Sequence, residues 1–155
     1  MPWGTDSTNC YDTVSNTLVR CDGNGVLGSI YLYPNQTASR MASTAVGMGQ
    51  KNTTDIITII GSGSYAALLA NSYSTPTVAA GGWFLPSKGE AMLMLTNMTQ
   101  AGIANFQNAP YWTSSEAGGQ FAFVVDFSLA NGMMLSLANA AIKYQGQYAR
   151  AIRSF

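Results

Sequence analysis

Three carboxylates in the second half of the chain have positions that could support acid–base chemistry. Glu90 could act as a catalytic acid, and Glu116 with Asp126 could form a carboxylate pair. Each also has a structural interpretation, because Glu90 lies three residues after a serine, which is the spacing of a helix capping box. Glu116 and Asp126 could hold Arg150 or Arg153 in a sheet, since an arginine among apolar residues needs an acidic partner. We favour the structural interpretation of all three.

Histidine is absent from the chain, which narrows the chemistry further. No Ser-His-Asp or Cys-His arrangement can be built, and no zinc site that uses imidazole. The segment 22–25 begins like an EF-hand loop but lacks the terminal glutamate and the flanking helices, and the other acids are scattered along the sequence. We therefore expect no enzyme, no metal and no cofactor.

Two cysteines, Cys10 and Cys21, lie in a short polar segment. An even count in a chain of this type predicts one structural disulfide. It would close a small ring and stabilise the fold by about 2–3 kcal/mol. Two unrelated buried thiols are the alternative.

The composition indicates an extracellular protein. Charged residues make up 9% of the 155 residues, against roughly 25% in a typical soluble chain. A surface of hydroxyl, amide, glycine and tyrosine groups suits extracellular binding proteins. The zero net charge gives no indication of nucleic-acid binding, and no apolar run is long enough for membrane insertion. We expect one secreted or cell-surface domain, cut from a longer protein whose export signal lies outside this chain.

Two helical segments are expected in the middle of the chain. The first starts at 52–55, breaks at 61–63 and resumes over 64–70. The second follows the Ser87 cap, and its body over 91–98 is apolar nearly all round and therefore expected to be well buried.

Strands are expected on both sides of these helices. Turn formers at 22–25 between two β-prone runs predict a hairpin over 17–33. After Pro110 the pattern becomes β, with strands at 121–127 and 133–137 around a turn at 131–132, and a last strand at 148–155. Strands at both ends, without a βαβ rhythm, predict an α+β fold.

Five motifs follow one another along the last two thirds of the chain: NTT at 52–54, GGWFLPSKGE at 81–90, YWTSSE at 111–116, FVVDFSLANG at 123–132 and ARAIRSF at 149–155. In this order they resemble the bacterial family named after the C-terminal domain of the Legionella collagen-like protein. The resemblance implies a C-type-lectin-like fold, in which two helices flank a twisted antiparallel sheet and the N- and C-terminal strands pair. It assigns 47–155 to the lectin-like core and leaves 1–46 as an N-terminal arm and hairpin of the same single domain.

The resemblance also implies a function. Members of the family include adhesins and fibre-tip domains, often homotrimers, and the namesake recognises sulfated glycosaminoglycans. We therefore expect a bacterial surface domain that binds a sulfated polysaccharide or a related host surface glycan. A phage or fimbrial tip module that recognises a protein or a neutral glycan is the alternative.

The chain differs at three points from the family that it resembles and from other proteins of similar fold. Many members of the family have a cysteine in the helix that corresponds to 65–70, where this chain has none. Calcium-dependent lectins with a similar fold use a Glu-Pro-Asn motif, whose leading acid is missing from Tyr33-Pro34-Asn35. Formylglycine-generating oxidases need a cysteine pair in their C-terminal half, which this chain also lacks.

A sulfated ligand would be attracted by basic side chains through charge-assisted hydrogen bonds. The binding candidates are Lys143, Arg150, Lys51, Lys88 and Arg153. A trimer would triple these groups around one axis; the alternative is that the three lysines are ordinary solvated side chains. Trp83 and Trp112 lie inside the motifs, where core packing is expected. The aromatic surface candidates are therefore Trp3, Tyr11, Tyr31, Tyr33, Tyr73 and Tyr144.

Overall fold

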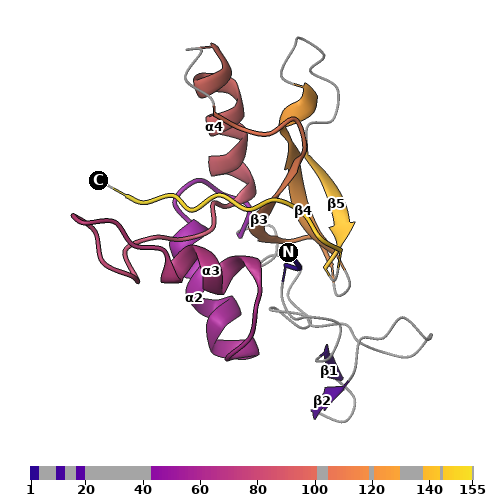
Figure 1. The fold of residues 1–155 in the computed structure, drawn as a ribbon. Coiled ribbons are helices and arrows are strands. Elements are labelled where there is room, and N and C mark those ends of the chain that lie inside the picture. Colours follow the sequence, from indigo (N-terminus) through magenta and orange to yellow (C-terminus); the bar gives the residue numbers. More distant parts are fainter. Residues whose placement is uncertain are drawn as a thin grey trace.

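Helices and an antiparallel sheet pack together in the computed structural model, which describes residues 1–3, 10–12, 17–19, 43–100, 105–118, 121–129, 138–143 and 145–154. The helices are α2 (Gly49–Ile60), α3 (Ala66–Ser72) and α4 (Lys88–Gln100). The sheet has the order β3 (Pro110–Glu116), β4 (Phe121–Asp126) and β5 (Ala138–Ile142), and the short helix η1 (Phe127–Leu129) follows β4. A second sheet pairs β1 (Cys10–Asp12) with β2 (Thr17–Val19). Figure 1 shows α4 along one part of the sheet and α2 with α3 beside another. The predicted α+β class is confirmed.

Helix α2 begins earlier than the sequence pattern indicated. It starts at Gly49, so the polar residues expected as its cap lie within it. Asn52 and Thr53 are buried and bind other segments: the Asn52 amide donates to the carbonyl of Ser43 (2.7 Å), and the Thr53 hydroxyl accepts from the backbone N–H of Leu85 (3.0 Å). Their polarity serves tertiary contacts, which local patterns do not distinguish from caps.

The break between α2 and α3 is where the sequence placed it. Gly61 follows α2 with φ 76°, a conformation that favours glycine, and its N–H donates to the carbonyl of Ile57 (2.8 Å). Helix α3 then starts at Ala66. A glycine is the residue that adopts such a positive φ at least cost, and it ends α2 here.

The capping box of α4 is confirmed. The Glu90 carboxylate accepts from the N–H of Ser87 (2.7 Å), and the Ser87 hydroxyl accepts from the N–H of Glu90 (3.2 Å). The expectation that the body of α4 is buried all round is wrong, because Leu93 is 49% exposed whereas Ala91 and Leu95 are buried. Only one side of α4 faces the sheet.

The sheet is antiparallel throughout, and its central strand is the one that the alternating pattern predicted. Strand β4 pairs with β3 from Pro110 opposite Asp126, with an irregularity between Trp112 and Glu116. It pairs with β5 from Phe121 opposite Ile142. The turn at 131–132, the strand at 133–137, and the turn and second strand of the hairpin over 17–33 lie outside the described residues.

The C-terminal segment crosses the molecule between α4 and α3 (Figure 1). The continuous strand predicted over 148–155 is wrong, because this segment makes only isolated bridges, Tyr148 parallel to Tyr111 and Ile152 antiparallel to Phe84. It touches two different partners that run in different directions, so no continuous ladder forms. The N-terminal residues lie beside its beginning, where the N–H of Gln147 donates to the carbonyl of Met1 (3.0 Å). Within the described residues, no strand pair joins the two ends.

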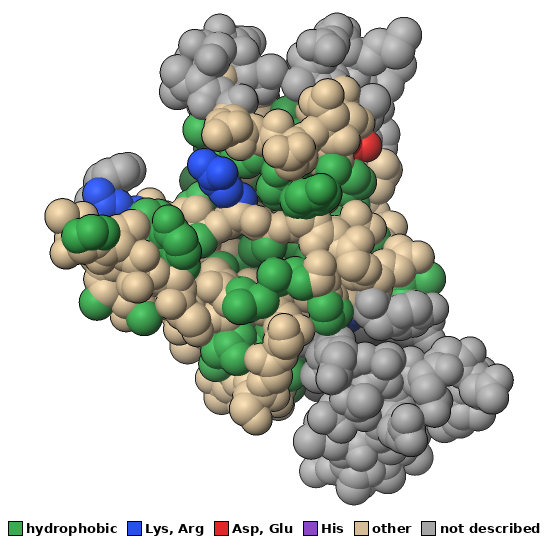
Figure 2. Space-filling view, in the orientation of Figure 1, with side chains coloured by type: hydrophobic (Ala, Val, Ile, Leu, Met, Phe, Trp, Pro, Cys, Tyr) green, Lys and Arg blue, Asp and Glu red, His purple; other side chains and the backbone are tan. Residues whose placement is uncertain are grey.

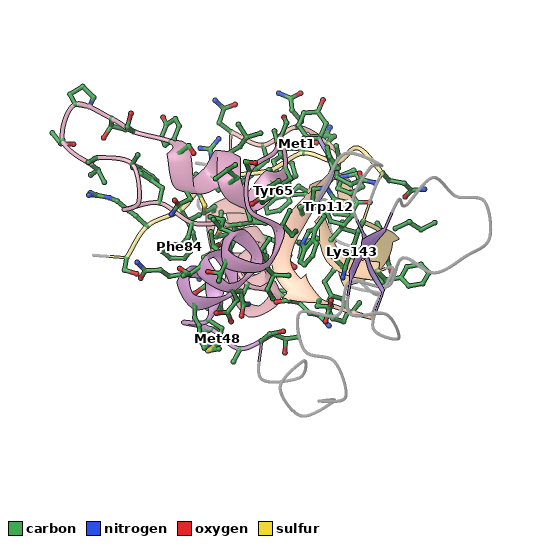
Figure 3. All side chains as sticks on the ribbon, turned by 90° about the horizontal axis from the view of Figure 1, so that it is seen from below. Met1, Met48, Tyr65, Phe84, Trp112 and Lys143 are labelled. Carbon is green, nitrogen blue, oxygen red and sulfur yellow. The ribbon has the colours of Figure 1, made fainter. Side chains whose placement is uncertain are left out.

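The core lies on both sides of β3 and β4. One cluster joins α2 and α3 to the sheet through residues that include Trp3, Ile56, Tyr65 and Trp112, and Figure 3 shows Tyr65 and Trp112 between these elements. The other cluster joins α4 to the sheet. Trp3 is fully buried and its indole N–H donates to the carbonyl of Thr113 (2.6 Å), so its assignment as a surface aromatic is wrong. In the described part of the chain, no helix is long and apolar enough to cross a membrane.

Candidate functional site

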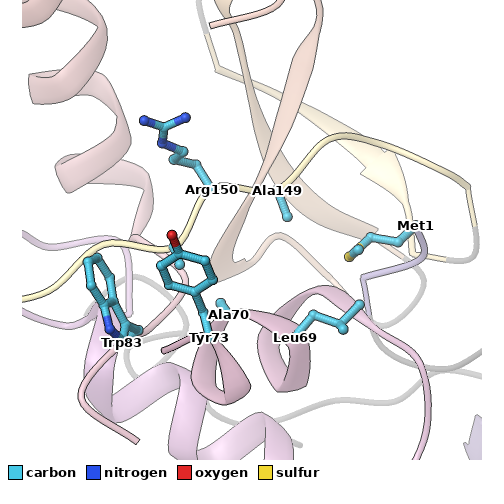
Figure 4. A pocket seen from close by; sticks show the side chains of 8 residues that line it. Met1, Leu69, Ala70, Tyr73, Trp83, Ala149 and Arg150 are labelled. Carbon is cyan, nitrogen blue, oxygen red and sulfur yellow. The ribbon is translucent and has the colours of Figure 1, made fainter. Parts of the chain in front are cut away.

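A groove of about 410 Å³ opens between α3 and the C-terminal segment. Its volume is within the range of small-molecule sites, roughly 300–1,000 Å³. Aliphatic side chains such as Leu69 form part of the lining, and three larger residues stand out among them: Tyr73, Trp83 and Arg150. Figure 4 shows the two rings side by side, with Arg150 on the C-terminal segment above them.

The two rings are positioned by the end of α3. Tyr73 is the first residue after this helix and has an extended backbone, so its side chain leaves the helix surface. The loop that follows returns to α3 through Asn71, whose carbonyl accepts from the N–H of Gly81 (2.7 Å) and whose amide donates to the carbonyl of Trp83 (3.4 Å). Trp83 is thereby held edge-on to Tyr73, with ring centroids 5.0 Å apart and planes at 85°, a favourable aromatic arrangement.

The structure separates the two tryptophans that the motifs contain. Trp112 is fully buried, as expected. Trp83 is only partly buried and lines the groove, so its assignment to the core is wrong. Tyr73, one of the aromatic surface candidates, is 50% exposed, which confirms its place on the surface.

Arg150 is exposed because the residues on either side of it face inward. Ala149 and Ala151 pack against the core cluster, and the alternation of an extended chain directs the residue between them outward. The Arg150 guanidinium carbon lies 5.3 Å from the ring centroid of Phe106, a cation–π contact that uses no N–H donor. Within the described residues, no hydrogen bond or ion pair engages its five donors.

Arg153 lies near the same groove. Its guanidinium carbon is 5.8 Å from the ring centroid of Trp83, and the residue is partly buried. The structure therefore brings two of the five basic candidates, Arg150 and Arg153, to the surroundings of one aromatic pair. Local spacing does not indicate that Trp83, some seventy residues away along the chain, is their neighbour.

The three lysines among the candidates lie elsewhere. Lys143 is 12% exposed at its side chain and forms an ion pair with the buried Glu116 (2.6 Å). Lys51 is exposed on α2 and forms an ion pair with Asp55, four residues later. Lys88 begins α4, with its ammonium 4.2 Å from the ring centroid of Phe123. Charged side chains are scarce on the face that Figure 2 shows. Basic side chains appear there at a few separate places, among hydrophobic and uncharged polar atoms.

The carboxylates considered for catalysis have structural partners. Glu90 accepts from the N–H groups of Ser87 and Gly47. Asp126 accepts from both the N–H and the hydroxyl of Ser128 (2.9 and 2.6 Å). The cation that binds Glu116 is Lys143, whereas the sequence suggested Arg150 or Arg153. Lys143 follows β5 directly, and the pairing of β5 with β4 brings it to the end of β3, a contact that local spacing does not reveal.

Some candidates lie outside what the structure describes: the side chains of Cys10 and Tyr11, and Cys21, Tyr31, Tyr33 and Tyr144 entirely. The predicted disulfide is therefore among them. In the described part of the chain, no group of three or more Asp, Glu or Cys residues could hold a metal ion. Sequence reasoning missed Leu69 and Phe106, which carry no chemical signal of their own and matter only because they adjoin Arg150 or the groove.

No family model, no curated protein and no solved structure matches the chain. The resemblance to the collagen-like adhesin family therefore stays a prediction from its motifs.

Proposed function

We propose that this chain is a non-enzymatic, extracellular bacterial adhesin domain with a C-type-lectin-like fold, which binds anionic host glycans such as sulfated glycosaminoglycans through the groove beside α3. One observation carries the proposal: an exposed arginine, whose N–H donors have no partner within the described residues, lines a groove of ligand size together with the half-exposed Tyr73 and the partly buried Trp83. A tyrosine ring can pack against the C–H face of a sugar. The guanidinium fork matches a sulfate or a carboxylate.

The lining of the groove favours binding over catalysis. None of the described residues that line it is acidic, so this part of the lining offers no carboxylate to act as general acid or base. The described lining is aromatic and aliphatic around one basic side chain, which is the usual composition of a site that holds a ligand by shape and a few polar contacts.

We also propose that the domain works as a homotrimer on the bacterial surface. Three grooves on one assembly would raise the avidity for a repeating polymer without any new contact. Large apolar side chains such as Leu93 and Phe121 are 49% and 42% exposed, and such groups are available for contacts between copies. Sedimentation equilibrium gives the assembly mass directly, and a monomer at micromolar concentration would contradict this part of the proposal.

The test of ligand class is binding to a glycan array at low and at high ionic strength. We expect heparin-like and other acidic glycans to bind, with weaker binding at high ionic strength, because salt screens exposed charges. Binding to neutral glycans alone, or to a host protein in a separate assay, would instead support the phage or fimbrial tip module. The largely uncharged lining of the groove is the observation in favour of that alternative.

A further inference from the structure

We infer that each groove recognises a single anionic group on a pyranose ring, with the ring lying on Tyr73 and the carboxylate or sulfate on Arg150. This inference rests on the proposed function and narrows it. The ligand class is a sugar that bears one negative charge at the contact, such as a uronic acid or a monosulfated hexose, in place of a densely sulfated run.

The number of basic side chains at the groove limits the number of negative charges that a ligand can place there. Of the five basic residues that the structure describes, Lys143 pairs with Glu116 and Lys51 with Asp55, while Lys88 lies at the start of α4 against Phe123. Only Arg150 is both exposed and part of the groove lining. Among the residues that the structure describes, Arg150 is therefore the one basic side chain that lines the groove.

The aliphatic part of the groove lining disfavours a second negative charge on the ligand. The rest of the groove surface includes Leu69 and three alanines. A second sulfate placed against these aliphatic side chains would lose water without gaining a hydrogen-bonding partner from them, which is unfavourable. The C–H face of a sugar ring meets no such penalty on the same surface.

The two rings have different roles. Trp83 has Tyr73 packed against it and Arg153 near its ring, and its indole nitrogen is buried; Figure 4 shows this nitrogen pointing away from Arg150. Tyr73 is half exposed and lines the groove, and Figure 4 shows its hydroxyl directed toward the C-terminal segment that carries Arg150. Tyr73 therefore supplies the face on which a sugar packs, and Trp83 is a positioning residue that holds Tyr73 edge-on.

NMR chemical-shift titration of the domain with three monosaccharides and one oligosaccharide tests the inference. This method measures weak affinities at a single site, without a contribution from avidity. The probes are methyl glucoside, methyl glucuronoside, glucose 6-sulfate and a heparin-derived hexasaccharide. We expect the glucuronoside and the sulfate to bind about 10- to 100-fold more tightly than the neutral glucoside, since a hydrogen-bonded charge contact is worth that factor. The hexasaccharide should show a salt dependence that corresponds to about one ion pair, by the counterion reasoning used for nucleic acids.

Three variants assign the contacts. Arg150→Gln should abolish the preference for the charged sugars while leaving the weak binding of the glucoside. Tyr73→Ala should weaken all the sugars by about 2- to 10-fold, whereas Tyr73→Phe should retain binding, because the ring and not the hydroxyl makes the contact. Trp83→Phe should act less strongly than Tyr73→Ala. Arg150 and Tyr73 are exposed, so we expect their variants to fold. Circular dichroism verifies this.

Two outcomes would separate the inference from the proposed function. Tight hexasaccharide binding with a steep salt dependence, insensitive to Arg150→Gln, would overturn the inference and the place of the site, and would leave an anionic-glycan adhesin with a different binding face. Absence of binding to every sugar probe would overturn both.

Discussion

The ammonium of Lys143 lies 2.6 Å from a carboxylate oxygen of Glu116, whose side chain has no exposed surface. The same ammonium is 4.6 Å from the ring centroid of Trp3, and the N–H of Trp3 donates to the carbonyl of Lys143 (2.8 Å). One lysine, directly after β5, thus joins the N-terminal segment to the end of β3. These contacts assign Lys143 to the stability of the fold and weaken its case as a glycan-binding residue.

Removal of this lysine should destabilise the protein strongly. Lys143→Met leaves the carboxylate of Glu116 buried without its cation, which costs about 3–5 kcal/mol in comparable pairs. The free energy of unfolding in urea measures the change. The double variant Lys143→Met/Glu116→Gln should recover a large part of it, and Lys51→Met, which breaks an exposed pair, should cost less than about 1 kcal/mol. A Lys143→Met variant as stable as the parent would show that the pair contributes nothing.

The sequence was informative where structure depends on local signals. The capping box at Ser87 and Glu90, the glycine break after α2 and the alternation of β4 are each written within a few residues, and each is present. It was misleading where long-range contacts override such signals. Asn52 resembled a cap and is a buried cross-link to Ser43.

The same limit applies to the candidate site. Basic and aromatic residues could be identified by type, but the groove exists only because the loop after α3 returns to Asn71 and places Trp83 beside Tyr73. The place of Arg150 in the same groove as this pair depends on where the C-terminal segment crosses the molecule. Local spacing indicates neither arrangement. The sequence therefore identified Arg150 as a candidate but not its neighbours in the groove.

The first residue of α2 must lack a side chain. A Cβ at Gly49 would lie 2.9 Å from the carbonyl oxygen of Leu85 and would overlap the carboxylate of Glu90, which accepts from the N–H groups of Gly47 and Ser87. Gly49→Ala should therefore destabilise the protein by about 1–3 kcal/mol in urea unfolding, as overpacking does elsewhere, despite the better helix propensity of alanine.

The matched control for this substitution is Gly118→Ala. A Cβ at Gly118 would meet no atom within 4 Å, so the change should be neutral or slightly stabilising, by less than about 1 kcal/mol. Equal effects at the two glycines would contradict the tight packing around Gly49.

Stability at alkaline pH should depend on Tyr65. Burial raises the pKa of the Tyr65 phenol above its ordinary range, which is about 10, so the unfolded chain ionises first as the pH rises. The contribution of Tyr65 to stability is present below about pH 10 and is lost as the pH rises through the folded-state pKa.

Tyr65→Phe removes this ionisation. The variant should lose about 1 kcal/mol at neutral pH, because the hydroxyl no longer donates to the carbonyl of Gly61, yet its stability should fall less than that of the parent above pH 10. Denaturant unfolding across the alkaline range gives both numbers. Parallel declines in the two proteins would assign the alkaline loss to other groups.

Retention on a heparin column should distinguish the groove from the other basic positions. Arg150→Gln and Lys51→Gln each remove one positive charge, so any difference between them reflects position and not net charge. Arg150 has donors that no described residue engages and lines the groove, whereas the ammonium of Lys51 is already paired with Asp55 on the surface of α2. We expect Arg150→Gln to elute at clearly lower salt than the parent and Lys51→Gln to elute with it. Lower salt for Lys51→Gln and no change for Arg150→Gln would place the glycan contact on α2 and remove the groove from the proposed site.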